Sequence, residues 1–146
     1  MIKAEDLRIG DLVIVNENCS LEQGTIGKVS EVRSTPLYKE NEGSIGLKPI
    51  SNDRWPYGVL CRNIDPIPLT PEILKKNGWR KRTEGWYFMM ISKYMYLSVE
   101  FGYENGIRVF LKRTTDGLYV KLNVANNIHE LQHILWALGK DANLKI

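Results

Sequence analysis

The clearest pattern of hydrophobic and polar positions lies between residues 94 and 124, where apolar and polar side chains alternate with a period of two. Such alternation is typical of strands that bury one face. Asn105-Gly106 and Asp116-Gly117 interrupt the alternation, and both dipeptides favour tight hairpin turns. With a further strand over residues 86–91, the pattern predicts a four-stranded antiparallel meander.

Helical patterns flank this meander on both sides. The first predicted helix covers residues 71–77, between Thr70 as N-cap and Gly78 just past its end. The second covers residues 128–138 and starts after Asn127, which opens an approximate capping box. Five apolar residues of the second helix share one face, which we expect to cover the aliphatic side of the sheet: Ile128, Leu131, Ile134, Leu135 and Leu138.

The first half of the chain is organised differently, in short apolar segments separated by turn residues. The expected strands cover residues 12–15, 25–32, 45–50 and 57–62, with a turn at residues 51–54. Short strands at this spacing favour a small, curved β-barrel. Three prolines in residues 65–71 then predict a stiff, extended connector.

The predicted fold class is therefore α+β, in two parts. Residues 1–65 form a small β-barrel-like unit, and residues 66–146 form a helix, a four-stranded antiparallel meander and a C-terminal helix. The apolar content of 43% and charged content of 25% are typical of globular proteins. The sequence has no stretch of 18 uncharged apolar residues and no secretory signal at its start, so we expect a cytoplasmic protein that does not cross a membrane.

The net charge of +3 is unevenly distributed. Residues 1–70 carry 8 Lys and Arg against 10 Asp and Glu, whereas residues 71–146 carry 12 against 7. Part of the positive charge is concentrated in one cluster: Lys75, Lys76, Arg80, Lys81 and Arg82. This cluster either attracts phosphate groups or is a solvated helix end, where the helix dipole favours cations.

Aromatic and basic side chains share the sheet face opposite the aliphatic one, if the alternation holds. They are Tyr94, Tyr96, Arg108, Phe110, Lys112, Tyr119 and Lys121. Rings interleaved with cations on an open sheet bind unpaired nucleic acid or nucleotides, because bases stack on the rings and phosphates meet the cations. Two alternatives are cover by the N-terminal unit and cover by a second copy of the chain.

A second candidate site is the segment His129-Glu130-Leu131-Gln132-His133, which satisfies the H-E-x-x-H pattern of zinc proteases. On a helix, the two histidines lie four residues apart and can share a zinc ion, while Glu130 acts as a general base. The 13 residues after His133 contain a single ionisable oxygen ligand, Asp141. A helical wheel also points both histidines away from the sheet, so we interpret them as solvated surface residues rather than as metal ligands.

Two resemblances add to this picture. The segments RIGDLV (residues 8–13) and GTIGKV (residues 24–29) resemble SH3-like barrels of the KOW type, whose modules contact nucleic acid or protein. LRIGDLV (residues 7–13), IPLTPEIL (residues 67–74) and HELQHILWALG (residues 129–139) together resemble a family of small uncharacterised proteins encoded by Bacteroidetes and their phages or mobile elements. That resemblance implies an accessory role in a bacterial or phage context and assigns no activity.

The sequence thus favours a non-enzymatic binding or adaptor protein without a cofactor. Its expected contacts are the aromatic and basic sheet face and the Lys75–Arg82 cluster, with nucleic acid, a nucleotide or a protein as partner. Two alternatives remain open at this point: a structural homo-oligomer, and a zinc-dependent hydrolase that uses His129, Glu130 and His133.

Overall fold

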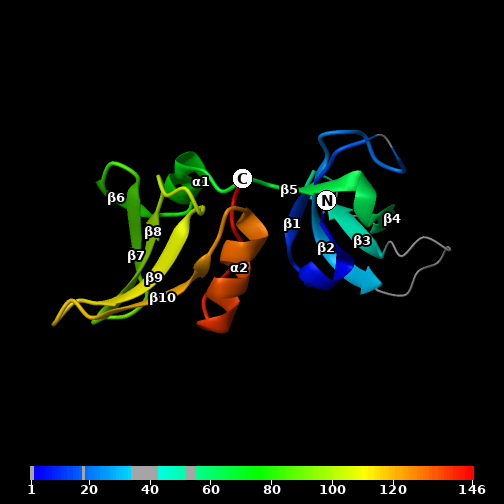
Figure 1. The fold of residues 1–146 in the computed structure, drawn as a ribbon. Coiled ribbons are helices and arrows are strands. Elements are labelled where there is room, and N and C mark those ends of the chain that lie inside the picture. The colour runs from blue at the N-terminus through cyan, green and yellow to red at the C-terminus, as the bar shows by residue number, and fades with distance from the viewer. Residues whose placement is uncertain (1, 18, 34–42, 52–54) are drawn as a thin grey trace. The chain divides into compact units, whose positions relative to one another are not determined.

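The computed structural model describes residues 2–17, 19–33, 43–51 and 55–146. The chain divides into two compact units, Met1–Ile67 and Pro68–Ile146 (Figure 1). Each unit contains one five-stranded antiparallel sheet, and the second unit adds two α-helices. The α+β class expected from the sequence is confirmed.

The sheet of the first unit has the strand order β4-β3-β2-β1-β5. Its strands are β1 (Leu12–Val15), β2 (Ile26–Arg33), β3 (Ser44–Pro49), β4 (Tyr57–Leu60) and β5 (Ile64–Pro66). Two short 3-10 helices, η1 (Ala4–Asp6) and η2 (Cys61–Asn63), complete it. The four expected strands are present, but β4 and β5 form the two edges of an open sheet, so the predicted barrel is not confirmed. Residues 52–54 of the expected turn lie outside the described part of the chain.

Strand β5 includes the start of the predicted stiff, extended connector. Pro66 lies opposite Val13 of β1, so the start of the expected connector belongs to the first sheet. A proline fits here because β5 is an edge strand and needs no N–H on its outer side. The inner faces of these strands enclose the core of the unit, in which Val13, Leu47 and Ile64 are completely buried.

The second unit begins with helix α1 (Pro71–Lys76), which ends one residue before the predicted boundary. Its sheet has the order β10-β9-β8-β7-β6. The strands are β6 (Arg80–Thr83), β7 (Trp86–Met90), β8 (Met95–Glu100), β9 (Arg108–Arg113) and β10 (Tyr119–Val124), followed by helix α2 (Ile128–Ala137). The predicted meander corresponds to β7–β10. Strand β6 was not expected, because its four polar residues show no apolar alternation.

The predicted two-residue alternation holds through β8 and β9 and fails in β10. Leu97 pairs with Leu111 and Val99 with Val109, which places these four side chains on one face. In β10, the register shifts between Lys121 and Asn123. Because such a bulge adds one residue to its strand, Asn123 lies opposite Val109 and the two sets of side chains exchange faces.

Helix α2 covers the aliphatic face, as the sequence predicts (Figure 1). The Asn127–Glu130 capping box is formed, with the Asn127 N–H donating to Glu130 Oε2 at 2.9 Å. The helix is buried over a wider arc than its apolar stripe, because the segment after Gly139 returns along it. Gln132 Nε2 donates to the Ala142 carbonyl at 2.9 Å, and both residues are buried.

The aliphatic face is incompletely covered near the β9–β10 hairpin. Leu118 and Val120, which the alternation assigns to the interior, are each 61% exposed. Figure 1 gives the reason: the β9–β10 hairpin extends away from α2, and the helix does not reach its tip. These two residues are therefore surface residues rather than core residues.

Candidate functional site

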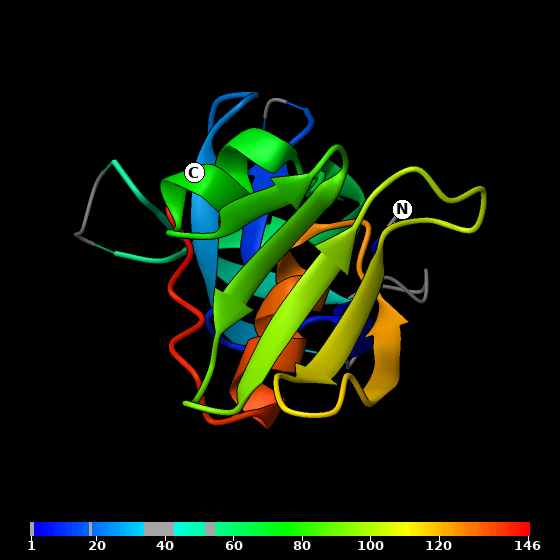
Figure 2. The ribbon, with the colours of Figure 1, turned by 90° about the vertical axis from the view of Figure 1, so that its left-hand side faces the viewer.

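The face of the second sheet that points away from α2 is open. In Figure 2, strands β7, β8 and β9 lie in front of α2, and no helix passes over them. Strand register places two kinds of side chain on this open face, aromatic and basic. They are Arg80, Arg82, Trp86, Phe88, Tyr96, Arg108, Phe110, Lys112, Tyr119 and Lys121.

Glu100 stands at the centre of the open face and is 3% exposed. Lys112 Nζ lies 2.6 Å from Glu100 Oε1, and the Lys112 side chain is itself only 13% exposed. The hydroxyls of Ser98 and Tyr103 also donate to this carboxylate, each at 3.2 Å. A buried carboxylate is stable only when its oxygens are paired in this way.

Burial by itself raises the pKa of the Glu100 carboxyl, since it disfavours the charged form. Hydrogen bonds from Lys112 and Trp86, together with the Lys112 charge, outweigh burial and leave the pKa below its ordinary value. Glu100 is therefore ionised at neutral pH and neutralises Lys112. Among the strand positions of this face, all of which are described, Glu100 is the only carboxylate.

Cations and rings contact each other across the open face. The Arg108 guanidinium lies 3.7 Å from the Tyr103 ring centre, and Lys112 Nζ lies 4.0 Å from that of Trp86. At the other side of the face, Arg82 lies 5.6 Å from the Trp86 ring centre and donates to the Tyr96 hydroxyl at 3.2 Å. These cation–π contacts hold the rings in fixed positions.

Arg108 differs from Lys112 in having no carboxylate partner among the residues that the structure describes. Its Nε is buried and makes no hydrogen bond to any described residue. A guanidinium that is stacked on a ring keeps its donors in one plane, suited to the oxygens of a phosphate or carboxylate. Arg108 is thus a half-buried cation of the open face.

The aromatic residues expected from the sequence differ in exposure. Tyr119 is 65% exposed, Tyr96 is half-buried, and Phe110 is buried with its ring edge against Tyr119, 5.7 Å between centres. Tyr94 is exposed, but it lies in the turn before β8 rather than on the strand. Tyr119 is therefore accessible, and the buried Phe110 ring packs against it.

The basic cluster is split by the fold. Lys75 and Lys76 occupy the last turn of α1, which agrees with a solvated helix end. Arg80 pairs with Phe88 across β6 and β7 and so shares the open face. Lys81 lies on the other face and forms an exposed ion pair with Glu84 at 2.7 Å.

Glu100 and three aromatic residues of the open face were not among the predicted contacts. Trp86 and Phe88 belong to β7, where their alternation with Tyr87 and Met89 gives the face once the register is known. The alternation that predicts the face begins at residue 94, so it does not include Trp86 and Phe88. Tyr103 lies in the loop after β8, and no strand pattern could have identified it.

The histidines of the H-E-x-x-H segment are not the solvated pair that the helical wheel predicts. His129 is buried and His133 is half-buried, with ring centres 5.8 Å apart. His133 also stacks on Trp136 at 5.7 Å. The helical wheel assumes that α2 is buried only on the side that faces the sheet. In the structure, α2 is also covered on other sides. The described residues contain no group of three His, Cys, Asp or Glu side chains placed to hold a metal ion.

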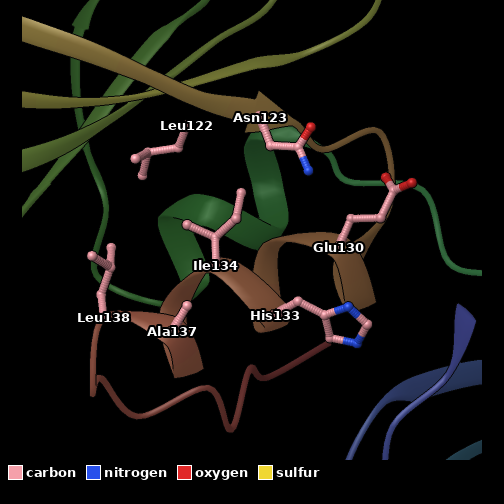
Figure 3. Close-up of a pocket in the computed structure, with 7 residues that line it drawn as sticks. All are labelled: Leu122, Asn123, Glu130, His133, Ile134, Ala137 and Leu138. Carbon is pink, nitrogen blue, oxygen red and sulfur yellow. The ribbon is translucent and has the colours of Figure 1, made fainter.

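His133 also lines a groove of about 320 Å³ between β10 and α2 (Figure 3). Leu122, Ile134 and Leu138 give the groove an apolar floor, and Asn123, Glu130 and His133 stand at its polar end. Glu130 is already engaged by the Asn127 N–H of the capping box. The groove is therefore mainly an apolar recess beside the edge strand.

No protein-family model, curated protein or solved structure matches the chain. Within the described residues, none of the helices is long and apolar enough to cross a membrane.

Proposed function

We propose that this protein is a non-enzymatic binding module that holds single-stranded nucleic acid on the open face of its second sheet. One observation carries the proposal: a face without helical cover presents half-exposed rings among cations, and Glu100, the only carboxylate among its described strand positions, is neutralised by Lys112. Unpaired bases stack on such rings, and the phosphate backbone follows the cations.

Three parts of the face have separate roles in this proposal. Trp86, Phe88 and Tyr96 supply the stacking platform, with Phe88 and Tyr96 packed edge to face at 6.0 Å between centres. Arg80 and Arg82 on the edge strand β6 bind phosphates on one side of the platform. Arg108, which is half-buried and stacked on the Tyr103 ring, binds a phosphate on the other side through its guanidinium.

Binding of labelled oligothymidylate, followed by fluorescence anisotropy over a series of salt concentrations, tests this function. We expect Arg80→Gln/Arg82→Gln to weaken binding and to lower the slope of log K against log salt by about 1.4, which is the loss of two phosphate contacts on a single strand. Both residues are exposed, so the fold is retained.

Lys75→Gln/Lys76→Gln is the matched control, because it removes the same charge from α1, away from the open face. We expect it to leave the salt slope nearly unchanged. Absence of binding at about 50 mM salt would refute the function, since electrostatic binding is strong there. Equal affinity for duplex DNA would also contradict it, because paired bases cannot stack on the rings.

We also propose that the first unit is an SH3-like module of the KOW type. Support comes from five consecutive antiparallel strands, with the 3-10 helix η2 between β4 and β5 and with β5 paired to β1. An accessory role in a bacterial or phage cytoplasm, as the resemblance of the three sequence segments implies, fits a module of this kind.

A further inference from the structure

Strand β10 is an edge of the second sheet, and half of its main-chain groups have no partner strand. The Arg113 N–H donates to the Leu118 carbonyl at 2.8 Å, so Leu118 turns its main chain toward β9. In an antiparallel strand, successive residues turn their N–H and C=O groups to opposite sides. Tyr119 and Lys121 therefore point theirs outward, where the described residues contain no further strand.

The side chains along this edge are unusually apolar for a solvent-facing strand. Leu118, Tyr119 and Val120 are three consecutive residues with exposures of 61%, 65% and 61%. Soluble proteins commonly protect edge strands with charges, prolines or bulges, because a bare apolar edge pairs with other strands. In β10, Lys121 and the bulge after it lie farther along the strand, and Leu118, Tyr119 and Val120 carry no charge.

We propose that β10 pairs antiparallel with β10 of a second copy of this chain, with Val120 facing Val120 of that copy across the two-fold axis. Val120 has a leucine two residues away on either side, Leu118 and Leu122, and Tyr119 and Lys121 next to it. This register sets Leu118 opposite Leu122 on the helix side and Tyr119 opposite Lys121 on the open face. The pairing joins the two sheets through the outward N–H and C=O groups of Tyr119 and Lys121.

Charge selects this register over its two neighbours. Moving the axis to Lys121 places two lysines directly opposite each other, which destabilises a strand pair. Moving it to Tyr119 places Leu122 opposite Asp116 and leaves Lys121 opposite Gly117. With the axis at Val120, each Lys121 lies beside a Tyr119 ring, a favourable cation–π arrangement.

The groove beside β10 accommodates the second copy. Leu122 of β10 lines this groove together with Ile134 of α2 and Leu138, the residue that follows α2 (Figure 3). In the proposed register, Leu118 of the second copy lies across from Leu122 and so reaches the apolar floor of the groove. The pairing thus buries the exposed Leu118 of each copy against the apolar floor of the groove in the other copy.

Light scattering over a concentration series reaching about 1 mM tests the pairing, since even weak self-association is populated there. We expect the mass of the wild type to rise from 16.8 kDa toward twice that value. Val120→Lys and Val120→Glu should each stay monomeric, because each places like charges on the axis. An equimolar mixture of the two variants should associate again, because opposite charges then meet.

A wild-type chain that stays monomeric throughout the series would overturn the proposal. Association of Val120→Lys equal to that of the wild type would do so too, as would a mixture of the variants that remains monomeric. Circular dichroism of each variant shows that the fold is intact, which is expected because Val120 is exposed.

Cross-linking tests the register itself. Val120→Cys in a Cys19→Ser background should form a disulfide-linked dimer on mild oxidation, because Cα atoms of such a directly opposed pair lie about 4.5 Å apart, within disulfide range. Cys19 is replaced because it is the exposed native cysteine. Lys121→Cys in the same background should not cross-link, and efficient cross-linking there would indicate a different register.

The pairing does not require nucleic acid. All measurements use protein free of nucleic acid, and Arg80→Gln/Arg82→Gln should associate like the wild type. Self-association without binding of oligothymidylate would support the pairing and refute the proposed function. Binding of oligothymidylate by a chain that stays monomeric would support the function and refute the pairing.

Discussion

Glu100 is the residue on which the arrangement of the open face depends. It is buried beneath rings and cations, and it accepts hydrogen bonds from Ser98, Tyr103 and Lys112. The Arg108 guanidinium in turn stacks on the Tyr103 ring. The carboxylate therefore positions side chains on both sides of the face, and its removal should affect stability as well as binding.

Glu100→Gln should lower the free energy of unfolding by about 2 to 4 kcal/mol, because it leaves the largely buried Lys112 ammonium without its counter-charge. Urea denaturation measures this loss. The double variant Glu100→Gln/Lys112→Met should recover part of it, since no unpaired charge remains. A double variant as unstable as the sum of the single ones would show that the two residues are not coupled.

The stability of the wild type should fall in acid, and Glu100 should account for part of the fall. Its pKa in the folded protein lies below the unfolded value of about 4.3, so the unfolded chain binds the proton more readily. The contribution of Glu100 is present above that pH and is lost as the pH falls through the folded pKa. Denaturation at several acidic pH values should therefore show a shallower pH dependence for Glu100→Gln than for the wild type. Equal slopes would contradict the lowered pKa.

At the scale of residues, the sequence could predict on which face of the sheet a side chain lies, but not which other side chain it contacts. The alternation assigns Lys112 and Phe110 to one face, and the structure agrees. Lys112, however, is directly opposite Tyr96, whereas it binds Glu100, four residues farther along β8. Only the sheet register and the reach of a long side chain determine that diagonal contact, so Lys112 was predicted as a ligand contact although Glu100 already neutralises it.

At the scale of elements, the hairpin between β8 and β9 depends on Gly106. Its φ is +95°, a left-handed conformation that favours glycine. A Cβ at this position would lie 2.3 Å from Asn126 Oδ1, which accepts a hydrogen bond from the Ile107 N–H at 3.0 Å. The turn thus connects β8 to β9 and also links the start of β9 to the residues that follow β10.

Gly106→Ala should destabilise the second unit by more than backbone strain alone, which costs about 1 to 2 kcal/mol for a left-handed alanine. The clash with Asn126 should add at least about 1 kcal/mol. Gly117→Ala is the matched control, because Gly117 also has a positive φ, +71°, but has open space around its α-carbon. Urea midpoints measure both, and equal losses would show that Asn126 moves aside freely.

Periodicity predicted most elements of the second unit and missed two features. Strand β6 consists of Arg, Lys, Arg and Thr, so it has no apolar residue to reveal a buried face. The bulge in β10 cannot be read from the sequence, because Leu118, Val120, Leu122 and Val124 continue a regular alternation through it. In the first unit, the turn residues between apolar segments predicted four strands correctly. Strand β5 was not predicted, because its proline indicated a connector.

At the scale of the whole molecule, the two units carry separate natural probes. Trp79, Trp86 and Trp136 lie in the second unit, while Trp55 of the first is 79% exposed and changes little on unfolding. Cys61 is buried in the core of the first unit, and Cys19 is exposed. Tryptophan emission therefore follows one unit, and the reactivity of Cys61 follows the other.

In the native protein, one thiol should react promptly with a thiol reagent, and Cys61 should react only when the first unit opens. Gly106→Ala should shift the urea midpoint of tryptophan emission without accelerating the labelling of Cys61, because the substitution lies in the other unit. Cys19→Ser removes the prompt reaction and leaves the slow one for measurement. Faster labelling of Cys61 in Gly106→Ala would show that the two units unfold together.

Strand β6 lies at the edge of the second sheet opposite β10. Its four residues are all exposed and three of them are cationic, so two β6 edges repel each other. In the pairing proposed above, β10 is already occupied and β6 disfavours a second contact, so we expect pairs of chains rather than longer assemblies. The positive charge of β6, which hydrophobic periodicity could not reveal, should therefore oppose fibre formation.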